Sequence, residues 1–158
     1  MPFAKLPGAT LEKMKQADVL VPCPLMLNEK GHMLTAQQEC LTRYYIDSGA
    51  AAVVPGTHTG QFARGSLELY AQWLELVSRM QARHGDSARM FRMAAVGGPR
   101  GFEMLRLAKE AGFEVVMVAP TALVDSRGKA LDEKDSLALL REMATVVPVY
   151  GFYLQRAV

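Results

Sequence analysis

The sequence predicts an α/β protein with a parallel sheet of about five strands and four helices. Short continuous apolar segments alternate with longer amphipathic segments of helical period. Several of the helical segments also carry a capping residue at the start or a glycine at the end. Parallel strands need long crossover connections, so this alternation indicates repeated βα units. Two architectures fit, an open doubly wound sheet and part of a (β/α)8 barrel.

The first apolar segment is Ala17–Leu27, which is typical of a strand buried on both faces. A helix is predicted from Thr35, which is placed to cap its start, to Gly49, which is placed to end it. Ala50–Gly56 is apolar again and predicts the second strand.

The segment after Ser66 gives the strongest helical pattern. Ser66 is an N-cap candidate, and one apolar stripe follows it, formed by Leu69, Tyr70, Trp73, Leu74 and Val77. Arg89–Gly98 predicts the third strand, and Gly101–Phe113 predicts the third helix, with Gly112 as its stop.

Glu114–Thr121 predicts the fourth strand, and a polar loop separates it from a fourth helix over residues 133–147. Pro148–Gln155 predicts the fifth strand. The 158 residues fit one domain without a linker. Length alone favours the open sheet, because a full barrel takes about 250 residues.

Composition excludes several functions. The net charge is +2 and the basic residues are scattered, so we expect no nucleic-acid partner. No apolar run reaches the roughly 20 residues of a membrane span, and no secretory signal is visible, so we expect a cytoplasmic protein with no membrane partner. Cys23 and Cys40 lack zinc-site spacing and are expected to be buried, reduced thiols. We expect neither a metal nor a cofactor.

Both architectures place ligands at the carboxyl ends of the strands. The loop "GTHTGQ" follows the second strand there. Thr57, Thr59 and the amides beside Gly60 are suited to hydrogen-bond a carboxylate, and His58 can relay a proton near neutral pH. The alternative is a solvated loop whose polar side chains satisfy local amides. Taken alone, the loop sequence favours neither the ligand site nor the solvated loop.

Two other strand ends carry weaker signals. "GGPRG", residues 97–101, joins a strand to a helix but lacks the glycine spacing of a dinucleotide site and the lysine of a P-loop, so an ordinary tight turn is favoured. Tyr150 and Tyr153 lie at the end of the fifth strand. A tyrosine there usually packs with a wet hydroxyl, but one that points into a polar pocket can act as an acid or base.

In this order, "PGTHTGQF" and "GFYLQ" resemble two motifs of the dihydrodipicolinate synthase / N-acetylneuraminate lyase family of class I aldolases. The stretch "LTRYYIDSGAAAVVPGTHTGQF" is similar to an uncharacterised branch with a His-Thr-Thr-Gln-Phe loop. The resemblance extends from about Val19 to Val158. It implies a (β/α)8 barrel that forms a Schiff base between a lysine and pyruvate or a related 2-oxo acid.

The resemblance also implies roles for single residues. Thr59 and the amide of Gly60 would hold the carboxylate, and Gln61 stands where the family has glutamate. The relay hydroxyl of the family falls on His58, and Thr57 is the alternative. Tyr153 matches the tyrosine that shuttles protons.

The sequence departs from the family pattern at three places. The family's second tyrosine aligns near Ala122, and its arginine after the fifth strand aligns near Val158, with Arg156 close by. The Schiff-base lysine belongs to a sixth strand, which this sequence lacks. Lys30 and Lys129 follow strands one and four but lie in polar loops, where a lysine is normally solvated, whereas a Schiff-base lysine needs burial or a neighbouring cation.

Five strands of an eight-stranded barrel would leave the first and fifth as unpaired edges. We therefore expect the amino-terminal portion of a barrel, truncated and inactive by itself, from a lyase that is a homo-oligomer. One alternative is a non-catalytic flavodoxin-like domain that binds a small anion or a nucleotide. Another is a half that completes a barrel with a second chain.

Overall fold

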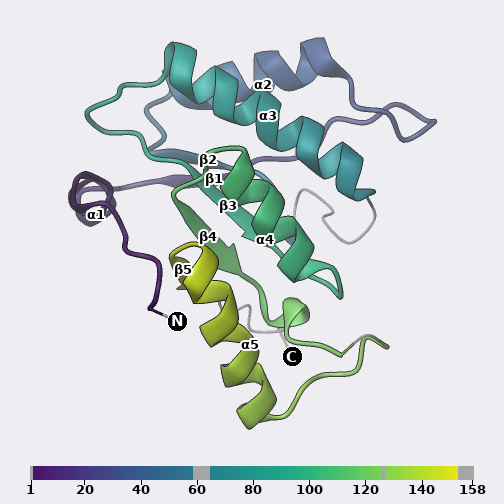
Figure 1. Cartoon of the computed structure of the whole chain (residues 1–158). Coiled ribbons are helices and arrows are strands. Elements are labelled where there is room, and N and C mark those ends of the chain that lie inside the picture. Colours follow the sequence, from purple (N-terminus) through teal and green to yellow (C-terminus); the bar gives the residue numbers. More distant parts are fainter. Residues whose placement is uncertain (1, 59–64, 126, 153–158) are drawn as a thin grey trace, which may run out of the picture.

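The computed structural model describes residues 2–58, 65–125 and 127–152. Strands and helices alternate along these residues as the sequence predicts (Figure 1). The elements, in order, are α1 (Gly8–Lys15), β1 (Leu20–Pro22), α2 (Thr35–Asp47), β2 (Ala52–Val54), α3 (Leu67–His84), β3 (Met93–Val96), α4 (Gly101–Glu110), β4 (Val115–Val118), the short 3-10 helix η2 (Pro120–Ala122), α5 (Glu133–Val146) and β5 (Val149–Gly151).

The strands follow one another in the order in which they occur in the sequence. β1 pairs with β2 in parallel, and β3, β4 and β5 form a second parallel ladder. Two backbone hydrogen bonds join β2 to the β3 segment, from Phe91 N to Ala51 O at 3.1 Å and from Ala95 N to Pro55 O at 2.8 Å. β1 therefore lies at an edge, whereas an open doubly wound sheet has it inside.

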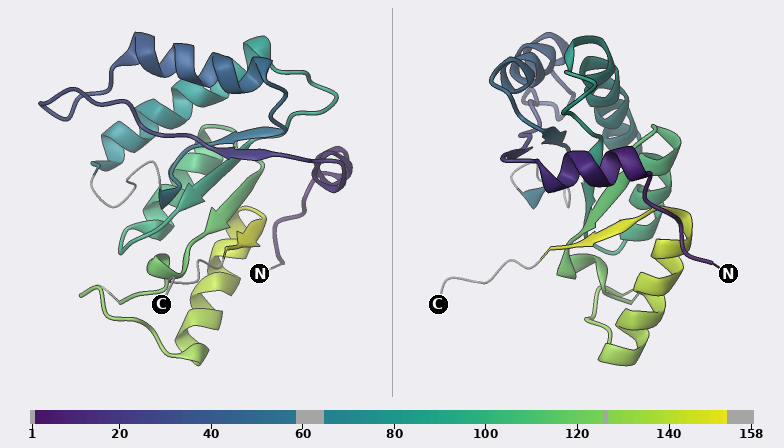
Figure 2. Two further views of the ribbon diagram at one scale, coloured as in Figure 1. Left: turned by 180° about the vertical axis from the view of Figure 1, so that it is seen from behind. Right: turned by 90° about the vertical axis from the view of Figure 1, so that its left-hand side faces the viewer.

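This order confirms the predicted fold class, part of a (β/α)8 barrel. Helices α2 to α5 lie on one side of the strands (Figures 1 and 2). The largest apolar side chains of the core are packed there, and Trp73, Leu74 and Val77 of α3 are at most 1% exposed. The stripe predicted for this helix is thus the surface that it packs against the sheet.

The opposite face of the sheet has its own small core. Ala52, Val54, Met93 and Ala95 are each at most 4% exposed. Side chains alternate between the two faces of a strand, so these residues point away from α2 to α5. Met14 of α1 packs against this inner core, and α1 lies beside the amino ends of the strands (Figure 1). The sequence pattern did not predict α1, so the described residues hold five α-helices where four were predicted.

The first and last strands are shorter than predicted. Only Leu20–Pro22 of the predicted Ala17–Leu27 strand is a strand. Pro22 and Pro24 have no N–H to donate, which limits ladder pairing there. Of the predicted Pro148–Gln155 strand, Val149–Gly151 is a strand and residues 153–155 lie outside the described part.

The structure also tests the predicted caps and thiols. Ser66 caps α3, because its side chain accepts a hydrogen bond from Leu69 N at 3.1 Å. Thr35 is instead the first residue of α2, and the residue before it makes no side-chain cap. Cys23 is buried as expected, whereas Cys40 is exposed on α2.

Each edge strand has one neighbour among the described residues. Tyr150 of β5 is 46% exposed and Phe152, just after it, is 36% exposed, so apolar surface lies along this edge. In residues 2–58, 65–125 and 127–152, no helix is long and apolar enough to cross a membrane.

Candidate functional site

The loop after β2 starts at the carboxyl edge of the sheet. The strand ladders among the described residues are all parallel, so β5 ends at the same edge as β2. The loops that follow β1 and β4 both lie at the right of Figure 1, on the side away from α1. Thr57 is half-buried and His58 is exposed, and both interact with neighbouring groups. Thr59, Gly60, Gln61 and Tyr153 lie outside the described residues, so their predicted roles stay predictions.

Gly56 lets the loop leave the sheet in close contact with β3. Its φ is +82°, a conformation that residues with a Cβ rarely adopt. A Cβ at this position would lie 2.1 Å from Ala95 O and 2.8 Å from Cε2 of Tyr70. Both the conformation and the space at this position therefore require glycine.

Tyr70 fixes the same point from α3. Its hydroxyl donates to Ala95 O at 2.9 Å, and Ala95 N donates to Pro55 O at 2.8 Å. Burial raises the pKa of Tyr70, so the phenol stays protonated and acts as a donor. This network holds the start of the β2 loop on the end of β3.

Arg100 contacts the far end of the same loop. Its Nη2 donates to Gly65 O at 2.7 Å, directly before the Ser66 cap. The guanidinium therefore lies between the loop after β3 and the loop after β2. From the sequence, Arg100 was predicted only as part of the "GGPRG" turn, because no sequence pattern marks a side chain that donates to a distant backbone carbonyl.

A buried amide organises the loop after β1. Gln38 of α2 is fully buried; its Nε2 donates to Pro24 O at 3.2 Å and its Oε1 accepts from Met26 N at 2.9 Å. Gln38 was not predicted from the sequence either. Its spacing from Thr42 and Ile46, four and eight residues on, marks the buried face of α2 and was the available signal.

Cys23 lies next to this amide. Gln38 Nε2 is 3.3 Å from its Sγ. Burial raises the pKa of Cys23 to about 11, against smaller opposing effects of hydrogen bonds to Thr42 and Gln38. The thiol is therefore protonated at neutral pH and is not a nucleophile.

The "GGPRG" turn packs closely against the segment after β4. A Cβ on Gly101 would lie 2.7 Å from the Cβ of Ala122 in η2. Gly98 N donates a weak hydrogen bond to Thr121 Oγ1 at 3.4 Å. This packing accounts for the glycine at 101 without a ligand.

None of the seven lysines is buried, and all of them lie in the described part of the chain. Lys30 and Lys129, the two that follow strands, are exposed. Among the described residues no group of His, Cys, Asp and Glu is arranged to hold a metal ion.

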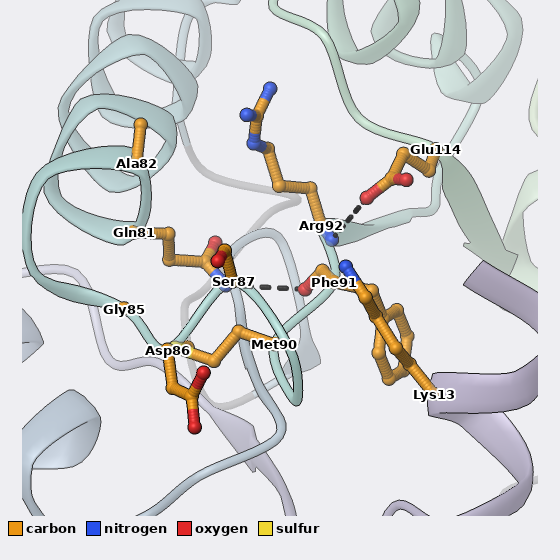
Figure 3. A pocket seen from close by; sticks show the side chains of 10 residues that line it. All are labelled: Lys13, Gln81, Ala82, Gly85, Asp86, Ser87, Met90, Phe91, Arg92 and Glu114. Carbon is orange, nitrogen blue, oxygen red and sulfur yellow. Dashed lines mark hydrogen bonds between the residues drawn. The ribbon is translucent and has the colours of Figure 1, made fainter. Parts of the chain in front are cut away.

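Two cavities lie at opposite ends of the sheet. One of about 480 Å³ lies between the β1 loop and the start of α3 and is lined by residues including Leu25, His32 and Glu68. The other, of about 370 Å³, lies at the amino ends of β3 and β4 (Figure 3). The first belongs to the edge that carries the predicted site, and the second does not.

No protein-family profile matches the chain, and no curated protein matches it. Solved structures do match. YagE, a prophage protein of the dihydrodipicolinic acid synthase family from E. coli K12 in complex with pyruvate, aligns with a TM-score of 0.73 at 15% identity over 87% of this chain and 45% of its own. Dihydrodipicolinate synthase from Aquifex aeolicus gives 0.72 at 15% identity, over 87% and 45%.

N-acetylneuraminate lyase from Mycoplasma synoviae, crystal form II, aligns with a TM-score of 0.68 at 16% identity, over 90% of this chain and 48% of its own. The chain thus spans less than half the length of these structures. At this identity the likeness establishes the fold, which is that of one portion of these barrels.

Proposed function

We propose that the chain is the amino-terminal part of a lyase or aldolase of the dihydrodipicolinate synthase / N-acetylneuraminate lyase family, acting on pyruvate or a related 2-oxo acid. The position of Gly56–His58 carries the proposal. This segment follows β2 at the carboxyl edge of a partial barrel, which is where barrel enzymes place their sites. Structures similar in fold include two that are complexed with pyruvate.

The residue roles follow from the loop and the family resemblance. Thr59 and the amide of Gly60 hold the carboxylate, because hydroxyl and backbone N–H donors suit an anion. His58 or Thr57 relays a proton, Gln61 replaces the glutamate of the family, and Tyr153 shuttles protons during imine formation. No cofactor takes part.

We further propose that the chain alone forms no Schiff base. An amine reacts with a ketone at neutral pH when burial or a neighbouring cation lowers its pKa. No lysine of this chain is buried, so none has the first of these environments. The nucleophile of the complete site would come from residues that this sequence does not contain.

Borohydride trapping with labelled pyruvate tests this point. The 158-residue chain should take up no label, while YagE, treated identically, serves as the positive control. Covalent label on a lysine of the isolated chain would disprove the proposal that it lacks the nucleophile.

Non-covalent binding tests the substrate class. Titration of the chain with pyruvate, followed by NMR, should shift the amides of Gly56, Thr57 and His58 and leave those of α5 unchanged. Thr57→Val and His58→Asn should weaken these shifts. If AMP or phosphate shifts residues 97–101 while pyruvate shifts nothing, the binding-domain alternative replaces this proposal.

The complete protein is proposed to be a cytoplasmic homo-oligomer without nucleic-acid or membrane partners. In this chain the exposed apolar side chains Tyr150 and Phe152 lie at the β5 edge and support association through that edge, because unpaired strand edges tend to pair with another chain. Light scattering measures this directly. A monodisperse monomer at every accessible concentration would contradict it.

A further inference from the structure

The β3 segment contacts the loop after β2 at both of its ends. At the start of the loop, Ala95 N in β3 donates to Pro55 O at 2.8 Å, and Ala95 O accepts from the hydroxyl of Tyr70 at 2.9 Å. At the far end, Arg100 Nη2 donates to Gly65 O at 2.7 Å. The loop that follows β2 therefore begins on β3 and returns to the turn that follows β3.

The contact between Arg100 and Gly65 is of a strong kind. A hydrogen bond from a charged donor is shorter and stronger than one between neutral groups, and 2.7 Å lies at the short end of the range for N–H to oxygen. Gly65 directly precedes Ser66, whose side chain accepts from Leu69 N at 3.1 Å and caps α3. A shift of the Gly65 carbonyl would therefore disturb the end of the loop and the first turn of α3 together.

The backbone that carries Arg100 is itself held in place. Its carbonyl accepts from Met104 N in α4 at 3.0 Å. The next residue, Gly101, is buried, and a Cβ there would lie 2.7 Å from the Cβ of Ala122 in η2. The Arg100 side chain thus reaches the neighbouring loop from a backbone that packs closely against the segment after β4.

Arg100 has no carboxylate partner in the part of the chain that the structure describes. The three ion pairs there involve Lys15, Arg43 and Arg79. The acceptor that the described residues offer to the Arg100 side chain is a backbone carbonyl, Gly65 O. The guanidinium stays protonated at any accessible pH, so this bond does not depend on titration.

We propose that Arg100 is a positioning residue for the 2-oxo acid site. By bonding to Gly65 O it fixes the far end of the β2 loop on the β3 turn, and so sets where the loop presents its donors to the substrate carboxylate. The inference rests on the function proposed above, because it concerns the loop that would hold this carboxylate. It gives the "GGPRG" turn a task that needs no nucleotide.

Spectra of the ligand-free 158-residue chain test the positioning itself. Arg100→Met removes the donors at an exposed position, so the fold should survive. The NMR signals of the Thr57 and His58 amides should shift. Hydrogen exchange of the Leu69 amide, which donates to Ser66 Oγ, should become about tenfold faster. Arg100→Lys keeps a charged donor and should restore most of both properties.

Arg92→Met is the matched control at the other end of the sheet. Arg92 also donates to a backbone carbonyl, from Nη1 to Gly112 O at 3.3 Å. Its side chain lies at the amino ends of β3 and β4 (Figure 3). Its loss should change neither the Thr57 and His58 signals nor the exchange of the Leu69 amide.

Pyruvate titration tests the consequence for binding. The affinity should fall about tenfold in Arg100→Met, return in Arg100→Lys and stay unchanged in Arg92→Met. Ligand-free spectra of Arg100→Met that match the unmodified chain would overturn the proposal. So would altered spectra with equal pyruvate affinity. If pyruvate does not bind even the unmodified chain, the proposed function fails, and the ligand-free spectra still decide whether Arg100 positions the loop.

Discussion

The two ends of the sheet use their polar groups differently. At the amino end, Glu114, which precedes β4, accepts hydrogen bonds from Arg92 N, which precedes β3, and from the hydroxyl of Thr10 in α1. Thr10 is only 1% exposed. At the carboxyl end, Tyr70 donates to Ala95 O in β3, and Gln38 bonds to Pro24 O and Met26 N in the loop after β1. At the amino end the polar groups thus bond to one another, whereas at the carboxyl end they hold the starts of the loops after β1 and β2. This division is the one that barrels show between stability and activity.

The largest expected effect is at the start of the β2 loop. Gly56→Ala should destabilise the protein by about 3 to 5 kcal/mol, because a Cβ meets the backbone oxygen of Ala95 and the positive φ is strained. Urea unfolding measures the change. Gly31→Ala is the matched control, with a φ of +79° but nothing within 4 Å of the added Cβ, and should cost about 1 kcal/mol. Equal losses in the two variants would show that contact with β3 does not matter.

The buried thiol at the end of β1 makes the carboxyl end sensitive to alkaline pH. The pKa of Cys23 rises on folding from 9.0 to about 11, so the folded state favours the protonated thiol. Its contribution is complete below pH 9 and is lost as the pH rises toward 11, by roughly 2 to 3 kcal/mol. Urea unfolding at pH 8 and pH 10.5 measures this decline, and Cys23→Ala should flatten it. An equally steep decline in that variant would assign it to other groups.

The amino end is tested through the contact between Thr10 and Glu114. Thr10→Val and Glu114→Gln should each cost about 1 to 2 kcal/mol, since each removes a hydrogen bond that ties α1 to the sheet. The double variant should lose less than the sum of the single losses. Pyruvate-induced shifts at the β2 loop should persist in all three variants. Strictly additive losses would mean that the two residues act separately.

Tyr70→Phe is expected to have the smallest effect on stability and a larger one on binding. It removes one hydrogen bond from Ala95 O and should cost about 1 kcal/mol. Pyruvate binding should weaken more than in Thr10→Val, whose loss of stability is similar. If both variants bind pyruvate equally, Tyr70 supports the core and does not position the loop.

Hydrophobic period was sufficient to predict the order of strands and helices and the buried stripe of α3. It failed for α1, because "GATLEKMK" has few apolar residues and its helix is held by Thr10 and Met14, whose partners are remote in sequence. The strand ends also shifted, since the prolines at 22 and 24 limit pairing within an apolar run that looks continuous.

The position of the candidate site could be predicted from the sequence, but the contacts that hold its loops could not. The β2 loop was identified by its polar residues and its place after a strand. Tyr70, Gln38 and Arg100 were missed because each donates to a backbone carbonyl in a different element, and such contacts leave no periodic pattern. The unsatisfied carbonyl of Gln81 could not be predicted either, because the hydrogen bonding of one buried oxygen depends on the atoms that the fold places around it.

The inner core has a consequence for how the protein is made. Its buried members all lie between Ala51 and Val115, and Leu6, Met14 and Ala17 from the amino terminus pack against them. The inner faces of β2 and β3 are therefore covered by side chains that all lie between Leu6 and Met117. This small core can assemble once β4 has been synthesised, so the nascent chain can bury these apolar side chains during synthesis.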